Sequence, residues 1–205
     1  MVSVTTPSLT RRVDPLTCDD PPDGAALQYR PMLLGCGQVY FADAKATDAR
    51  VERYCPGLQA AMLALMARVV GAEVVPRRGY CGPGVHVFPA GGWVAENGGE
   101  IHFDTEGLAP AHSRARSPAV TGVLMLQPPE DGGALRLWDV TYEGSDEVTD
   151  AMMEREHYDA DYRRGELVVL DSYRLHQIQP FGGELDRVSV TCHAAYVAGQ
   201  WETWF

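Results

Sequence analysis

The chain has 205 residues, of which 45% are hydrophobic, and it carries a formal net charge of −11. This length is enough to bury the core of one domain, so we expect a single functional site. The acidic balance argues against a nucleic-acid partner, because neutralising phosphates requires a basic surface. No stretch provides the roughly eighteen apolar residues of a membrane span. Nor does an apolar core follow the N-terminal arginines, so a soluble, cytoplasmic protein is expected.

The first part of the chain predicts an arm followed by helices. Residues 1–27 are rich in Pro, Asp and Thr without periodicity, which is typical of an extended arm. Residues 28–205 are then expected to form one domain. Apolar residues recur at helical spacing after Gly57, and Gly71 provides a stop, so helical support is predicted over about 44–72.

From about residue 84 to 198 the sequence changes to short runs of β-forming residues separated by Gly and Pro. Such a succession predicts a mainly β fold of the sandwich or jelly-roll type. The expected strands are residues 85–89, 100–104, 119–127, 134–139, 166–171, 175–179 and 187–197. Residues 141–164 interrupt this rhythm with many acidic side chains, and they predict a long loop or short helix that forms a lid-like insertion.

A candidate metal site begins with His102 and Asp104. Residues two apart in a strand point to the same side, so the imidazole and the carboxylate would converge on one point. His176, in the predicted strand 175–179, supplies a third ligand. Two histidines and one carboxylate that leave positions open form the facial triad of non-haem iron(II) oxygenases. The short HxD pattern is weak evidence alone, since a chain with six histidines produces it readily by chance.

A buried arginine strengthens this interpretation. Arg187 follows His176 by 11 residues and lies in a predicted strand whose two faces differ. One face carries Arg187, Ser189, Thr191 and His193, and the other carries Val188, Val190 and Cys192. An arginine aimed into a β fold is costly unless it meets an anion, and its planar fork suits a carboxylate. A dicarboxylic co-substrate is therefore expected.

With these residues in place, the chain resembles the iron(II)/2-oxoglutarate-dependent dioxygenases, in their prolyl-hydroxylase-like branch. The matching segments are HFD at 102–104, GGALRLWD at 132–139, GELVVLDSYRLHQI at 165–178 and RVS at 187–189. The resemblance implies a double-stranded β-helix (jelly-roll) barrel with flanking N-terminal helices. It also implies Fe(2+) held by His102, Asp104 and His176, with 2-oxoglutarate and O2 as co-substrates that yield succinate and CO2.

By the same resemblance, Arg187 and Ser189 bind the distal carboxylate of 2-oxoglutarate. The family often places a tyrosine on the strand before HxD, where Phe88 cannot form a hydrogen bond. His86, on the same face, is the candidate to replace it. Halogenases of the superfamily have a small residue where this chain has Asp104, so the resemblance implies hydroxylation of an unactivated C–H bond or a related oxidation.

Substrate contacts are predicted at four positions. Thr105 and Glu106 follow the metal ligands directly, while Arg136 and Trp138 alternate with leucines on a strand that could face the cavity. If the acidic segment 141–164 folds over the site, its charge favours a cationic substrate.

Three classes of function stay open. The first is an oxygenase acting on a small molecule, such as a free amino acid or a specialised metabolite. The second is a peptide or protein hydroxylase of the prolyl type. The third is a cupin-like metal-binding or isomerase protein, although cupins usually supply an HxH pair that this sequence lacks. The oligomeric state is not encoded in any readable pattern.

Overall fold

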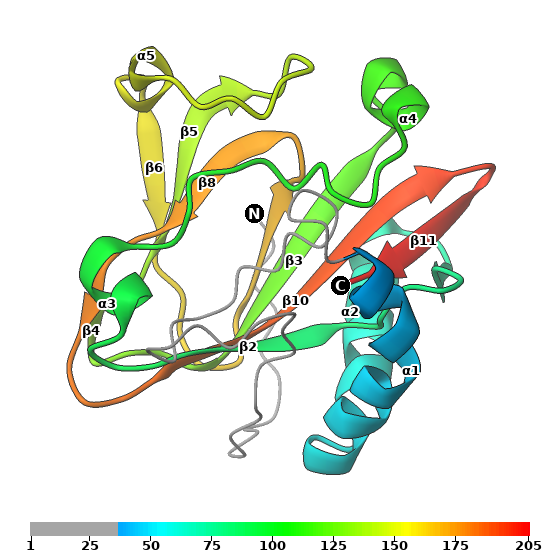
Figure 1. Cartoon of the computed structure of the whole chain (residues 1–205), viewed down its shortest axis with the longest axis horizontal. Helices are drawn as coiled ribbons and strands as arrows, with labels where there is room; N and C mark the ends of the chain where they lie inside the picture. The colour runs from blue at the N-terminus through cyan, green and yellow to red at the C-terminus, as the bar shows by residue number, and fades with distance from the viewer. Residues whose placement is uncertain (1–36) are drawn as a thin grey trace.

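The computed structural model describes residues 37–205 (Figure 1), and the predicted arm at residues 1–27 lies outside this range. The described part is mainly β, as predicted, and begins with two helices, α1 (Gly37–Tyr54) and α2 (Leu58–Val70). Three short helices follow: α3 (Trp93–Asn97), α4 (Pro110–Ala115) and α5 (Asp150–Met153). No helix within residues 37–205 is long and apolar enough to cross a membrane.

Most strands lie where the sequence predicts them. They are β1 (Val74–Pro76), β2 (Gly84–Phe88), β3 (Ala119–Gln127), β4 (Asp131–Gly132), β5 (Leu135–Thr141), β6 (His157–Ala160), β7 (Leu167–Asp171), β8 (Arg174–Ile178), β9 (Phe181–Gly182), β10 (Arg187–Val197) and β11 (Gln200–Trp204). The predicted strand at residues 100–104 is reduced to an isolated bridge between His102 and His176. It follows β8 through single hydrogen bonds and forms no continuous ladder.

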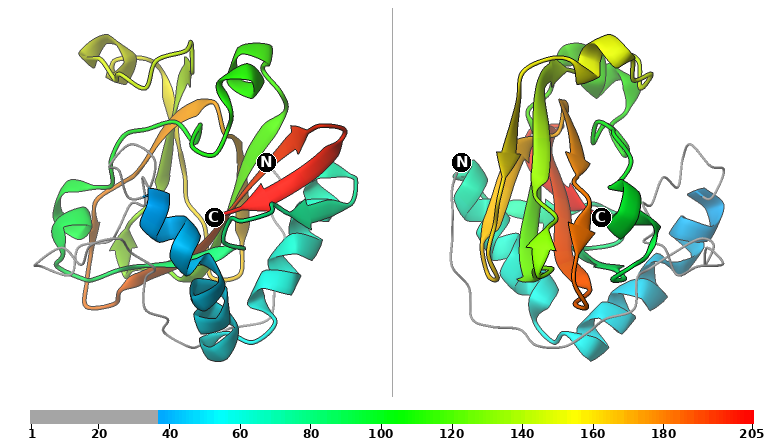
Figure 2. Two further views of the ribbon diagram at one scale, coloured as in Figure 1. Left: turned by 45° about the vertical axis from the view of Figure 1, so that its right-hand side comes forward. Right: turned by 90° about the vertical axis from the view of Figure 1, so that its left-hand side faces the viewer.

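Two sheets form the body of the molecule. The major sheet has the order β1-β11-β10-β3-β7, with β2 also paired to β10, and the minor sheet has the order β6-β5-β8. They pack face to face: Val123 and Leu170 of the major sheet lie in one apolar cluster with Leu135 of the minor sheet. Among the described residues no ladder joins the two sheets. The predicted barrel is therefore an open sandwich, with residues 99–104 along one side (Figures 1 and 2).

Helix α2 covers the outer face of the major sheet. Its buried residues are Leu58, Met62, Leu65 and Met66, and Gly71 ends the helix in the left-handed conformation with φ 69°. Close packing needs a glycine on the facing strand, since a Cβ at Gly122 would lie 2.7 Å from the Met66 sulfur. Helix α2 thus covers one face of the major sheet, and the other face faces the minor sheet and the cavity.

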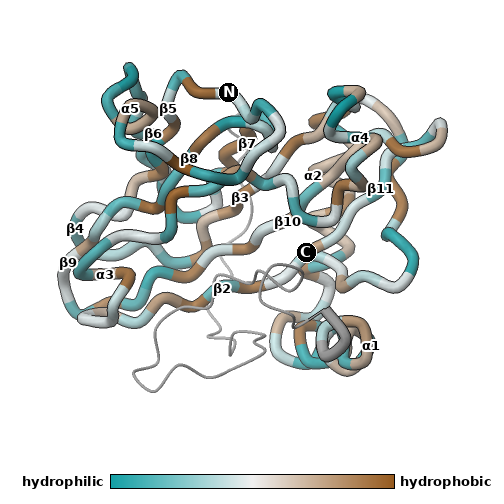
Figure 3. The backbone as a smooth tube through the Cα atoms, turned by 45° about the horizontal axis from the view of Figure 1, so that its top comes forward, coloured by the Kyte–Doolittle hydropathy of each residue, from teal (hydrophilic) through white to brown (hydrophobic). Residues whose placement is uncertain are grey.

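The strands alternate polar and apolar residues over short stretches (Figure 3). In β10 the alternation is sharp: Val188, Val190 and Cys192 belong to the cluster beneath α2. Arg187 and Ser189, on the opposite face, line a cavity between the sheets. One strand therefore supplies both the core and the site, as the period of two requires.

The acidic segment 141–164 is more ordered than a simple loop. Its second half contains β6, which pairs with β5 and extends the minor sheet. Its first half packs over the segment that carries the metal-ligand candidates: Val148 and Met152 lie against a cluster that contains Phe103 and Trp138.

We predict that Met62→Ala destabilises the protein by about 2–5 kcal/mol, because it leaves a cavity beneath α2. Met62 is fully buried, whereas Arg68 on the same helix is exposed. Urea denaturation should show the loss for Met62→Ala and a change within about 0.5 kcal/mol for the control Arg68→Ala. Equal effects of the two substitutions would contradict this packing.

Candidate active site

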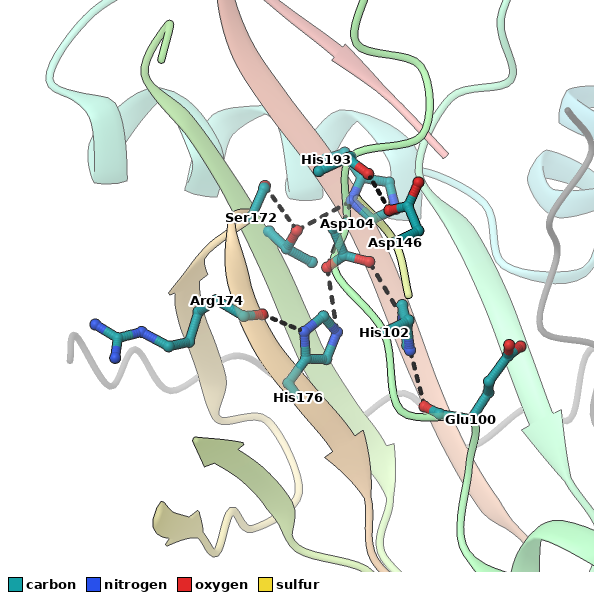
Figure 4. A network of polar contacts seen from close by, with 10 residues as sticks. Glu100, His102, Asp104, Asp146, Ser172, Arg174, His176 and His193 are labelled. Atoms are coloured by element: carbon teal, nitrogen blue, oxygen red, sulfur yellow. Dashed lines mark hydrogen bonds and ion pairs between the residues drawn. The ribbon is translucent and has the colours of Figure 1, made fainter. Parts of the chain in front are cut away.

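The three predicted metal ligands converge in the structure. The Nε2 atoms of His102 and His176 lie 3.3 Å from Asp104 Oδ1 and Oδ2, respectively (Figure 4). The ligand atoms of this group all lie within 4.8 Å of one another. His102 and His176 also exchange backbone hydrogen bonds of 3.1 and 3.0 Å, which fix one against the other.

Backbone carbonyls orient both imidazole rings. His102 Nδ1 lies 2.8 Å from the Glu100 carbonyl, and His176 Nδ1 lies 2.9 Å from the Arg174 carbonyl. Because a carbonyl can only accept, each Nδ1 carries the proton. Each Nε2 then presents its lone pair toward the centre of the group, as in metal-binding histidines held by their surroundings.

The electrostatics suit a metal site as well. Burial lowers the pKa of His176 to about 4, although Asp104 opposes the shift, so the ring is neutral at pH 7. Burial raises the pKa of Asp104, but the neighbouring histidines, His176 first, outweigh it and hold this pKa well below its usual range. A neutral imidazole at His176 and a carboxylate at Asp104 are the protonation states in which these two groups bind a divalent metal.

A further observation, a buried carboxylate oxygen, indicates that these three residues fit a metal ion. Asp104 Oδ2 is buried and accepts no hydrogen bond among the described residues. A buried carboxylate oxygen without a donor is costly unless a cation satisfies it. The donor set, two imidazoles and one carboxylate, is that of a non-haem iron(II) centre with open positions.

Arg187 lies in the same cavity and is completely buried. Its Nη1 donates to Ser189 Oγ at 3.1 Å, and its Nε donates to the Gly133 carbonyl at 3.3 Å. Among the described residues no carboxylate pairs with it. Burial lowers its pKa to about 9, which leaves it charged at neutral pH. Within residues 37–205, this buried cation therefore has no anionic partner.

Tyr162 is a site residue that the sequence did not reveal. Its hydroxyl accepts a hydrogen bond from Arg187 Nη2, and its ring lies 5.4 Å from the guanidinium. It follows β6, within the segment expected to be a lid. No pattern links it to Arg187, because the contact depends on how β6 returns along the minor sheet.

His86, the candidate to replace the family's tyrosine, lies on β2 beside β10. It pairs with Ser189 across the β2–β10 ladder, stacks on Phe88 at 5.5 Å and lines the cavity. Burial lowers its pKa to about 3, assisted by the charge of Arg187. It therefore contributes a neutral imidazole beside the arginine.

The four predicted substrate residues separate into two pairs. Glu106 lines the cavity, and Thr105 beside it donates to Asp146 at 3.0 Å. Arg136 and Trp138 do not line it. Arg136 pairs with Asp159 of β6 at 2.7 Å, and Trp138 is buried in a cluster with Phe103 and Leu175. The strand alternation directs Leu135 inward, and it directs these two residues outward.

Comparisons with known proteins give the fold a precedent. No protein-family model matches the chain, and no curated protein sequence matches it. A solved structure of an N-substituted L-amino acid dioxygenase from Burkholderia ambifaria AMMD matches with a TM-score of 0.60 at 14% identity, over 87% of this chain and 73% of that one. A second structure of such a dioxygenase from the same organism, in complex with alpha-KG, matches with a TM-score of 0.54 at 14% identity and the same coverage. The predicted resemblance to 2-oxoglutarate dioxygenases is therefore confirmed for the fold.

We predict that the protein binds one divalent metal per chain and that His176→Ala weakens this binding more than about tenfold, since one of three ligands is lost. Titration with Co(II), followed by its visible absorption, measures the affinity. The control is His157→Ala, because His157 is exposed and does not line the cavity. Equal affinities for wild type and His176→Ala would place the metal elsewhere.

Proposed function

We propose that this protein is an iron(II)/2-oxoglutarate-dependent oxygenase of the double-stranded β-helix fold that hydroxylates an unactivated C–H bond of a small molecule. The observation that carries the proposal is that the His102–Asp104–His176 group and the buried Arg187 line one cavity. Among the described residues, Arg187 forms no ion pair with a carboxylate. The fold likeness to an N-substituted L-amino acid dioxygenase supports it and favours a small substrate over a peptide.

The proposed site residues would bind the two ends of the co-substrate separately. His102, Asp104 and His176 would hold iron(II), and Arg187 with Ser189 would bind the distal carboxylate of 2-oxoglutarate through charge-assisted hydrogen bonds. His86 lines the cavity beside them. When bound, iron and 2-oxoglutarate supply the oxidising chemistry, in which O2, the co-substrate and a C–H bond become succinate, CO2 and an alcohol. The protein fixes the components and excludes water.

The direct test is an anaerobic titration of metal-free protein with iron(II) and 2-oxoglutarate. We expect a weak visible charge-transfer band that requires both additives and that needs at least tenfold more 2-oxoglutarate in Arg187→Met. Succinate formation should then require iron(II). A folded protein that binds metal and shows no band with 2-oxoglutarate would favour the cupin-like, non-redox alternative.

The same variant has an expected effect on stability. Arg187→Met replaces a buried unpaired charge with an apolar side chain of similar length, so the metal-free protein should be as stable as wild type or more stable. Wild type should gain thermal stability with 2-oxoglutarate and Mn(II), whereas Arg187→Met should gain it only from Mn(II). A full 2-oxoglutarate shift in the variant would contradict the role of Arg187.

Tyr162 is expected to position Arg187. Tyr162→Phe removes the hydroxyl that contacts the guanidinium, so the KM for 2-oxoglutarate should rise about three- to tenfold. Metal affinity should not change. The matched control is Tyr158→Phe, because Tyr158 lies in β6, just before Tyr162 in the chain, and is 58% exposed. A merely structural role for Tyr162 would lower stability and leave the KM unchanged.

A further inference from the structure

Three polar side chains lie beside the metal-ligand group and have no role in the proposed function. They are Thr121 of β3, Ser172 in the turn between β7 and β8, and His193 of β10. Thr121 Oγ1 lies 3.0 Å from Ser172 Oγ and 3.0 Å from His193 Nδ1 (Figure 4). We call these three residues the Thr–Ser–His network.

Packing does not explain the Thr121 hydroxyl. Thr121 shares the inner face of β3 with Val123 and Met125, which belong to the apolar cluster between the sheets. A valine at residue 121 would continue that face, and a buried hydroxyl is costly unless it is hydrogen-bonded. Thr121 is 1% exposed and Ser172 is 2% exposed, so within the described residues each hydroxyl depends on the network for a partner.

Backbone pairing holds the network in register. Thr121 lies directly opposite His193 in the β3–β10 ladder. The Ser172 N–H donates to the Ala119 carbonyl at 3.1 Å, which ties the turn between β7 and β8 to the same strand. Neighbouring backbones therefore fix the positions from which the three side chains meet.

The network reaches Asp104 from two sides. The Asp104 N–H donates to the Ser172 carbonyl at 2.9 Å, so the backbone of this metal-ligand candidate is attached to one member. His193 Nδ1 lies 3.9 Å from Asp104 Oδ2. This oxygen is the one that accepts no hydrogen bond among the described residues. Both the backbone and the carboxylate of Asp104 are thus next to the network.

Asp104 differs from the other two ligand candidates in what orients its side chain. A backbone carbonyl orients the ring of His102, and another orients the ring of His176. The Asp104 carboxylate has no such partner at Oδ2, and the nearby network is placed to supply the constraint.

The carboxylate also favours one arrangement of protons in the network. The Thr121 hydroxyl has a single proton, so it donates to one of its two partners and accepts from the other. A proton on His193 Nδ1 is attracted by the negative charge of Asp104, so this arrangement is the favoured one. His193 then donates to Thr121, Thr121 donates to Ser172, and the His193 N–H dipole lies beside the carboxylate.

We propose that Thr121, Ser172 and His193 are positioning residues that hold Asp104 in place to bind the metal ion. The proposal rests on the proposed function, which assigns a metal to the group formed by Asp104 and the two histidines. None of the three belongs to that ligand group, so each would act through Asp104. Partners that orient ligands in this way commonly change metal affinity by about ten- to a hundredfold.

The test is titration of the metal-free full chain with Co(II), followed by its visible absorption. Thr121→Val keeps the shape of the side chain and removes the hydroxyl, so it should weaken Co(II) binding about tenfold and alter the cobalt bands. His193→Phe keeps a ring beside Trp204 and should have the same effect. His193→Asn returns an N–H donor near the place of Nδ1 and should recover most of the affinity. Ser172→Ala, the smallest change, should also weaken binding.

The matched control is Thr191→Val, because Thr191 lies two residues before His193 on β10 and its hydroxyl forms no hydrogen bond among the described residues. It should change neither the affinity nor the bands. The melting temperature of each metal-free variant is measured as well. A lower melting temperature with wild-type affinity and bands in Thr121→Val and His193→Phe is the result of a merely structural role, and it would overturn the proposal.

Equal losses in His193→Phe and His193→Asn would also overturn it, since the donor at Nδ1 would then be irrelevant. Failure of the wild type to bind any metal would count against the proposed function, and the positioning role would fail with it. Wild-type binding that none of the network variants changes counts against the positioning role alone.

Discussion

The burial of the Arg187 guanidinium between two sheets is the constraint on which the rest of this structure depends. A buried charge without an ionic partner is costly. Within the described residues, three neutral groups accept hydrogen bonds from the guanidinium: the Gly133 carbonyl and the hydroxyls of Ser189 and Tyr162. Such an arrangement is unfavourable for stability alone. Under the proposed function, the distal carboxylate of 2-oxoglutarate would supply the missing anion.

Apolar packing on the outer face of the major sheet offsets the energetic cost of burying Arg187. On β10 the side chains opposite the cavity join the apolar cluster beneath α2, where Met62 and Met66 are fully buried. The hydrophobic contribution of that layer offsets the polar face within a single strand. The metal-ligand group depends on the sandwich in another way: His176 comes from the minor sheet, and backbone hydrogen bonds hold His102 against it.

The cavity between the two sheets brings groups of opposite charge together. Arg187 is the only lysine or arginine among its described lining residues, and the carboxylates of Asp104 and Glu106 line the same cavity. Under the proposed function, the anionic co-substrate would therefore meet its cationic partner at Arg187.

The sequence by itself determined those features of the protein that follow from the spacing of nearby residues. The alternation of β10 and the helical pattern after Gly57 predicted that strand and helix α2, and the HxD spacing together with His176 predicted the group that converges in the structure. Contacts between distant segments have no periodic signature, and only the tertiary structure revealed them. Thus Tyr162 meets Arg187 through the return of β6, and Tyr40 of α1 donates a hydrogen bond to the carbonyl of Phe205, next to β11. The outward direction of Trp138 was likewise decided by which face of β5 packs against the major sheet, since either face of an isolated strand could have been the inner one.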